Sequence, residues 1–79
     1  MILRFTPETS KWVSDHIWHK DQKAKILEDG SLELRFPVAE FSEIAREIMK
    51  HGSGVEVIQP ESLRQLIKEE AEEILKIYR

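Results

Sequence analysis

The chain has 79 residues, of which 41% are hydrophobic and 34% are charged, and its formal net charge is −3. This length fits one domain, and the acidic balance argues against a protein that binds duplex DNA by bulk electrostatics, because phosphate binding needs an excess of basic residues. Cysteine is absent, which excludes a disulfide framework, a thiolate zinc site and a cysteine nucleophile. No apolar run approaches the roughly 20 residues of a membrane span, so we expect a single cytoplasmic domain over residues 1–79.

The N-terminal part predicts a strand followed by a helix. Ile2–Phe5 has the pattern of a short strand. Thr6-Pro7 then opens a helix, since Thr can cap free backbone N–H groups and Pro favours the first helical position. We expect this helix to end near Ile17–Trp18. The residues expected to face inward share helical spacing: Trp12, Val13, His16 and Ile17.

A β-hairpin is predicted next. The polar residues from Lys20 to Lys23 should form a loop, followed by a strand over Lys25–Glu28. Asp29-Gly30 is a tight-turn signal. Alternating apolar residues then predict a half-buried strand, which proline ends because it has no N–H for the ladder. These residues are Leu32, Leu34 and Phe36, followed by Pro37.

The remaining residues predict two helices and a strand between them. Apolar residues at helical spacing predict a helix over Ala39–Lys50, and Gly52 can adopt the left-handed conformation that ends it. Val55–Ile58 is the fourth strand, and Pro60-Glu61 starts a helix that runs to residue 79. The order β-α-β-β-α-β with an extra C-terminal helix predicts an α+β fold: the ferredoxin-like sandwich, a four-stranded antiparallel sheet with two helices on one face.

Two further expectations concern the sheet. Ile2–Phe5 and Val55–Ile58 should be neighbouring central strands, with the hairpin strands outside them. The face without helices should need an apolar cover, from the final helix or from a second copy of the chain, because so small a domain cannot bury every apolar residue itself. We therefore expect a homodimer, or a monomer that associates strongly as its concentration rises, through the open face of the sheet or the final helix. The interface candidates lie on the apolar stripe of the final helix: Leu63, Ile67, Ile74 and Tyr78.

Metal binding and catalysis find little support in the sequence. His16 and His19 are three residues apart with Asp15 and Asp21 nearby, a spacing that can serve a metal, but His16 falls on the apolar stripe and His51 lies on another element. The acidic residues lie mostly on predicted helix exteriors, and phosphate-loop, dinucleotide and nucleophile-elbow motifs are missing. We expect no metal, no cofactor and no enzymatic activity.

The connection between the first helix and the hairpin is the strongest candidate for binding. Trp18 offers a stacking plane, His19 and Gln22 offer hydrogen bonds, and Lys20 and Lys23 offer positive charge, a combination that can hold nucleic-acid bases and phosphates. The alternative is that Trp18 only closes one end of the core. If the connection binds a ligand, replacing His19 or Gln22 with alanine should leave the melting temperature nearly unchanged.

An ordered set of short motifs resembles one protein family. The motifs are Leu3-Arg4-Phe5, Ile17-Trp18-His19 with Gln22, Asp29-Gly30, Leu34-Arg35-Phe36-Pro37-Val38, Gly54-Val55-Glu56-Val57-Ile58 and Pro60-Glu61-Ser62-Leu63-Arg64. Together they cover nearly the whole chain and are similar to the C-terminal extension, called WCX, of bacterial transcriptional regulators with a WYL domain. Each motif alone is unspecific, and their order carries the resemblance.

What the resemblance implies is regulation. The family's members look like three-part proteins with a winged helix-turn-helix, a WYL domain and this extension, so the chain would be the C-terminal fragment of a longer regulator. The extension would help the regulator to dimerise and to sense an effector, which for some members is single-stranded nucleic acid. Trp18, His19 and Gln22 match the family pattern and are carried over as effector or interdomain candidates.

The implied partners are the WYL domain of the same full-length chain, a second copy, and a nucleic-acid or small-molecule effector. The resemblance implies no duplex-DNA binding by this fragment, and we expect no membrane partner. A second reading from the residues alone stays open: a free-standing ferredoxin-like domain that binds a small ligand.

Overall fold

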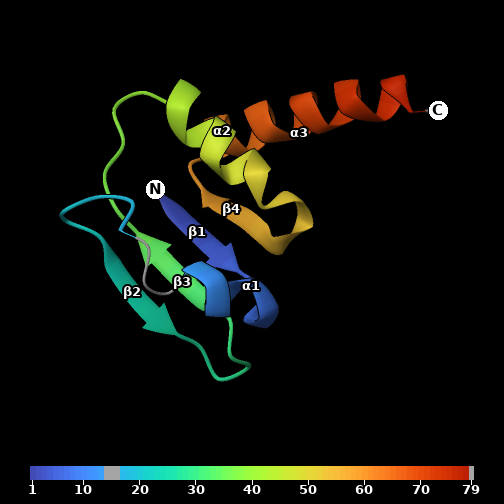
Figure 1. The fold of residues 1–79 in the computed structure, drawn as a ribbon. Coiled ribbons are helices and arrows are strands. Elements are labelled where there is room, and N and C mark those ends of the chain that lie inside the picture. Colours follow the sequence, from blue (N-terminus) through green and yellow to red (C-terminus); the bar gives the residue numbers. More distant parts are fainter. Residues whose placement is uncertain (14–16, 79) are drawn as a thin grey trace.

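The computed structural model describes residues 1–13 and 17–78, and these residues form an α+β fold (Figure 1). A four-stranded antiparallel sheet carries three helices in this part of the chain. The strands are β1 (Ile2–Phe5), β2 (Lys23–Ile26), β3 (Leu32–Arg35) and β4 (Val55–Gln59). The helices are α1 (Pro7–Val13), α2 (Ser42–Lys50) and α3 (Glu61–Ile77), with a short 3-10 turn, Gly52–Gly54, before β4.

The strand order in the sheet is β2-β3-β1-β4. The predicted pairing of the first and last strands is confirmed, since Phe5 lies opposite Val55 and Leu3 opposite Val57. The prediction that β4 is central and that both hairpin strands are outer is wrong. β3 lies between β2 and β1, where its two buried leucines are flanked by strands on both sides, whereas β4 is an edge strand that α3 covers.

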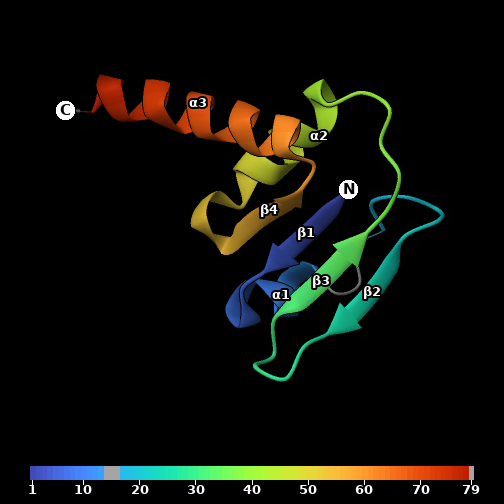
Figure 2. The same ribbon diagram turned by 180° about the vertical axis from the view of Figure 1, so that it is seen from behind.

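The two faces of the sheet differ because successive side chains in a strand point to opposite sides. The face under α1 and α2 is apolar and forms the core; both helices lie in front of the sheet in Figure 1 and behind it in Figure 2. Its buried strand residues are Leu3, Phe5, Leu32, Leu34 and Val57. Helix α2 adds Ala45 and Ile48 to this core.

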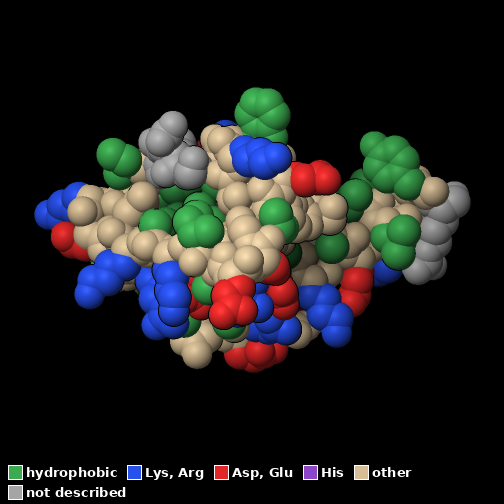
Figure 3. All heavy atoms as spheres, turned by 90° about the horizontal axis from the view of Figure 1, so that it is seen from below, with side chains coloured by type: hydrophobic (Ala, Val, Ile, Leu, Met, Phe, Trp, Pro, Cys, Tyr) green, Lys and Arg blue, Asp and Glu red, His purple; other side chains and the backbone are tan. Residues whose placement is uncertain are grey.

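The opposite face is charged. One cross-strand row runs from Lys25 through Glu33 and Arg4 to Glu56, so that each charge lies beside one of opposite sign. Seen from below, acidic and basic side chains mingle along this side of the molecule (Figure 3). The expectation of an apolar open face that needs a cover is therefore wrong, because the strand alternation places charged residues of both signs side by side there.

Helix α1 is shorter than predicted and presents a different face. Its buried residues are Ser10 and Val13, three positions apart, and Ser10 Oγ donates a hydrogen bond to the Gly30 carbonyl at 3.2 Å. Trp12 lies one residue, or about 100°, around the helix from Val13 and is 85% exposed. Ile17 is also exposed and is not helical, so the prediction that these two residues face inward is wrong. His16 lies outside the described residues.

Other boundaries shift by a few residues. β2 begins and ends two residues earlier than predicted, and α2 begins at Ser42 rather than Ala39, where a Glu40 carboxylate oxygen accepts a hydrogen bond from the Ser42 N–H at 2.8 Å. The predicted turn at residues 29–30 is confirmed: Gly30 has φ +90°, and the Asp29 carboxylate accepts hydrogen bonds from the Ser31 hydroxyl and N–H. These bonds lower the pKa of Asp29.

Candidate functional site

Trp18 lies at the centre of an aromatic cluster that joins four parts of the chain. The centroid of its indole is 5.7 Å from the ring of Phe5 in β1, 6.3 Å from that of Phe36 after β3, and 5.8 Å from that of His51 after α2. The Phe5 and His51 rings also meet edge to face at 5.8 Å. Trp18 therefore closes one end of the core, as the alternative interpretation expects, and is not a free stacking plane on the surface.

Gln22 holds the connection in shape. Its side-chain oxygen accepts hydrogen bonds from the backbone N–H of Trp18 at 2.6 Å and from the backbone N–H of His19 at 3.2 Å. The backbone N–H of Gln22 donates to the His19 carbonyl at 3.1 Å. His19 stacks on Phe36 with centroids 5.9 Å apart, and its Nδ1 accepts a hydrogen bond from the Asp21 N–H at 3.0 Å. The polar groups that the sequence offers as ligand contacts thus take part in a compact turn.

This geometry revises the expected effect of a change at Gln22. Gln22→Ala should cost about 1–2 kcal/mol, because two partly buried N–H groups lose their acceptor, which corresponds to a fall in Tm of roughly 4–16 °C in a domain of this size. Gln22→Glu keeps an acceptor oxygen and is the matched control, and thermal unfolding followed by circular dichroism measures both. An alanine variant with the Tm of the wild type would contradict a stabilising role for these hydrogen bonds.

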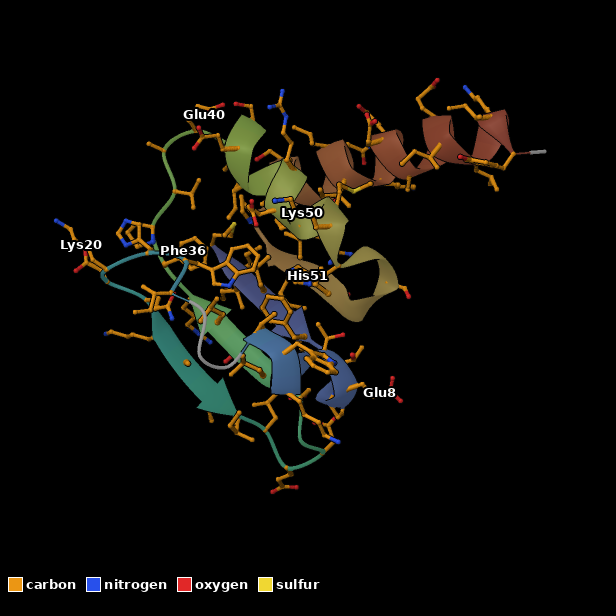
Figure 4. All side chains as sticks on the ribbon, viewed as in Figure 1. Glu8, Lys20, Phe36, Glu40, Lys50 and His51 are labelled. Carbon is orange, nitrogen blue, oxygen red and sulfur yellow. The ribbon has the colours of Figure 1, made fainter. Side chains whose placement is uncertain are left out.

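The two lysines of the candidate set do not join the aromatic cluster. Lys20 is exposed at the tip of the loop and points away from the body in Figure 4. Lys23 begins β2, opposite Arg35, and lines a shallow hollow with Asp21 and Arg35. The five residues predicted as one basic-aromatic site therefore separate into a core tryptophan, a structural turn and two solvated cations.

A groove of about 770 Å³ lies beside the cluster, between the connection, the segment after β3, and α2. Trp18, His19 and Phe36 form the aromatic part of its lining. The remaining lining is aliphatic, acidic and basic: Ile17, Pro37, Val38, Ala39, Glu40, Glu43, Ile44, Arg46, Glu47 and Lys50. In the sequence these residues are predicted only as the end of a strand and one face of a helix. Nothing in their spacing shows that they lie beside Trp18.

The charges around the groove do not favour an anion. The lining holds three glutamates and two cations, and Lys50 is paired with Glu47 at 2.8 Å. The hydrogen bonds from Ser42 lower the pKa of Glu40, so its carboxylate is charged at neutral pH. A neutral or apolar group fits this surface better than a polyphosphate does.

A second exposed apolar surface lies on α3, whose C-terminal half extends beyond the sheet (Figures 1 and 2). We call this surface the outer α3 surface and define it by its exposed residues: Ile74, Leu75, Ile77 and Tyr78. Hydrophobic side chains gather at this end of the molecule in Figure 3. An apolar groove between α2 and α3 continues it inward, lined partly by Ala45, Met49 and Leu66.

The four interface candidates on α3 fall into two groups. Leu63 is 0% exposed and belongs to the chain's own core, and Ile67 is half-buried against that core. The expectation that Leu63 faces a second copy is therefore wrong, because the first turn of α3 packs on β4. Ile74 and Tyr78 lie on the outer α3 surface and stay candidates.

No group of three His, Asp or Glu side chains placed to hold a metal ion occurs in residues 1–13 and 17–78. None of the helices described is both long and apolar enough to cross a membrane. The family model of the WCX domain matches residues 1–75. No curated protein matches the chain.

Proposed function

This chain belongs to the WCX domain family, and we propose that it is the regulatory and dimerisation module of a WYL-type DNA-binding transcriptional regulator, with no catalytic activity and no duplex-DNA binding of its own. Family membership supports a regulatory domain that accompanies a WYL domain. The cytoplasm is the compartment in which such a regulator would act. The ferredoxin-like classification is part of the same proposal, and the strand order β2-β3-β1-β4 supports it.

The observation that carries the assembly role is the outer α3 surface. Tyr78 is 81% exposed and Ile77 is 74% exposed, on a helix whose first turn is anchored in the core through Leu63. A helix that is anchored in the core and presents several large apolar side chains to water is typical of a protein–protein contact. A second copy of the chain would cover the outer α3 surface in an isologous interface, in which both copies contribute the same residues.

The regulatory role would use the groove beside Trp18. Its aromatic and aliphatic lining comes from three separate segments, so a group that enters the groove contacts the connection and α2 at the same time. A neighbouring WYL domain that inserts an apolar side chain there would couple its own state to the position of α2. This role differs from the anion-binding role that the basic-aromatic composition suggests.

Sedimentation of the chain over a wide concentration range tests the assembly role. The wild-type chain should show a weight-average mass that rises with concentration, whereas the double variant Leu75→Glu/Ile77→Glu should stay monomeric, because charge on the outer α3 surface would have to be desolvated in the contact. Both residues are exposed, so the melting temperature should change little.

The matched control is Lys76→Glu, which changes a charge on the same helical turn without altering a residue of the outer α3 surface. Lys76 forms an ion pair with Glu73 at 3.0 Å and is exposed, so this variant should associate like the wild type. A wild-type chain that remains monomeric at millimolar concentration would refute dimerisation through α3 and leave the groove as the remaining support for the proposal.

A further inference from the structure

The two edge strands of the sheet, β4 and β2, differ in what covers their outward backbone groups. At the β4 edge, the Val57 carbonyl points away from β1 and accepts a hydrogen bond from Arg64 Nη1 at 2.7 Å. The Arg64 guanidinium is itself held by Glu56 at 3.6 Å and Glu61 at 3.2 Å. Helix α3 and this arginine therefore occupy the edge, which prevents another strand from pairing with β4.

The β2 edge has no comparable cover among the described residues. All four residues of β2 are exposed, and β2 is the outermost element on its side of the sheet in Figures 1 and 2. The backbone pairing can be read from the hairpin, where the Leu27 N–H donates to the Ser31 carbonyl at 2.8 Å. Bonded pairs alternate in an antiparallel ladder, so Lys25 and Lys23 also direct their backbone groups to β3.

The alternate residues of β2, Ala24 and Ile26, therefore direct their N–H and C=O groups outward. The other side of β3 agrees with this register. The Phe36 N–H donates to the carbonyl of Met1, the residue before β1, at 3.2 Å, so the even-numbered residues of β3 direct their backbone groups to β1 and the odd-numbered ones to β2. Two residues whose outward backbone groups have no hydrogen-bond partner among residues 1–13 and 17–78 form a short template for an additional strand.

The side chains of β2 define what such a strand should carry. Lys23 and Lys25 lie on the charged face, whereas Ala24 and Ile26 lie on the helix side of the sheet, beyond the cover of α1, with Ile26 61% exposed. We propose that the free edge of β2 binds an extended segment of a partner protein in which acidic residues alternate with apolar ones, as a fifth strand of the sheet. The acidic side chains would lie beside the lysines and the apolar ones beside Ala24 and Ile26.

The occupied side of β2 supports this pattern. There, β3 places Glu33 opposite Lys25, with Leu32 and Leu34 opposite Ile26 and Ala24, so the pattern holds at three of the four pairs; at the fourth, Arg35 lies opposite Lys23. A second strand with the same alternation would repeat these cross-strand pairs on the free side. Such pairs each contribute roughly 0.2–1 kcal/mol in sheets relative to alanine pairs.

A second copy of this chain is a poorer occupant. Symmetric antiparallel pairing of two β2 strands sets residues of the same face opposite one another, so Lys23 would meet Lys25 of the other copy, or Lys25 would meet its own equivalent. Like charges directly opposite one another destabilise strand pairing, and lysines on an edge strand are a known protection against self-pairing. The lysines therefore disfavour pairing between the β2 strands of two copies of the chain and favour pairing with an acidic segment.

The test uses the 79-residue chain and a synthetic peptide in which three glutamates alternate with valines, with NMR titration as the measurement. We expect shifts of the β2 amide signals and slower hydrogen exchange at the Ala24 and Ile26 amides. A control peptide with lysine in place of glutamate should bind at least roughly tenfold more weakly because of charge repulsion. The double variant Lys23→Glu/Lys25→Glu should reverse the preference between the two peptides.

A backbone variant separates strand pairing from simple charge attraction. Ala24→Pro removes an N–H that points outward and no hydrogen bond to β3, a position at which edge strands tolerate proline. It should weaken binding of the acidic peptide roughly tenfold while both lysines remain. If Ala24→Pro does not fold, the charge-reversal variant and the exchange rates of the wild-type chain decide.

Three outcomes would overturn the proposal. They are no binding of the acidic peptide at millimolar concentration, shifts confined to the groove beside Trp18 or to α3, and unchanged exchange at Ala24 and Ile26 in the saturated complex. Self-association that Ala24→Pro abolishes would identify a second copy as the occupant instead. The outer α3 surface lies at the far side of the sheet, so variants there leave this result unaffected.

Discussion

The Trp18→Ala variant should lose about 3 kcal/mol of stability, because the indole supplies the contacts that join Phe5, Phe36 and His51 at one end of the core. A chain of this length has about 4–12 kcal/mol in total at the usual stability per residue, so the loss is a quarter of it or more. The corresponding fall in Tm is roughly 12–24 °C.

The second tryptophan provides the matched control. Trp12 is 85% exposed on α1, so Trp12→Ala should change the free energy of unfolding by less than about 0.5 kcal/mol. Urea unfolding followed by circular dichroism measures both variants. In a Trp12→Phe background, the fluorescence of the remaining tryptophan reports the environment of Trp18 alone.

A Trp18→Ala variant as stable as the wild type would mean that the indole is not part of the core. The indole would then be available as a stacking plane for a nucleic-acid base, and nucleic-acid binding by the chain would become the next measurement. The hydrogen bonds from the Trp18 and His19 N–H groups to Gln22 would still keep the connection in its turn.

The Leu63→Ala variant should cost about 2–5 kcal/mol, the range for removing a large aliphatic side chain from a packed core. Leu63 is 0% exposed and belongs to the core cluster, and α3 packs on β4. Most of the stability of a helix in a protein comes from the packing of its apolar face, rather than from the intrinsic propensity of its residues. The loss should therefore appear both in global stability and in faster hydrogen exchange along α3.

Ile77→Ala is the control on the same helix. Ile77 is 74% exposed, so its truncation should change stability by less than about 0.5 kcal/mol while weakening self-association. The two variants thus separate the anchored first turn of α3 from its outer surface. Equal stability loss in both would mean that the outer α3 surface packs against this chain, and the proposed dimer contact would fail.

The order of the elements and several local features could be predicted from the amino-acid pattern. Periods of two and of 3.6 residues located the four strands and three helices, and Asp29-Gly30 located the hairpin turn, because these features depend on residues close together in the chain. The pairing of the first and last strands also followed from the order of elements. The ordered motifs identified the WCX family, which the family model matches over residues 1–75.

Which residues belong to the core and which to a surface depends on contacts between distant segments of the chain. Helical spacing predicts that Trp12 faces inward and places Trp18 in a connection, yet Trp12 is 85% exposed and Trp18 contacts both Phe5 and His51. Such contacts carry no periodic signal, so neither spacing nor composition encodes them. The same limit applies to the β2 edge, whose openness depends on where α3 and Arg64 lie in space.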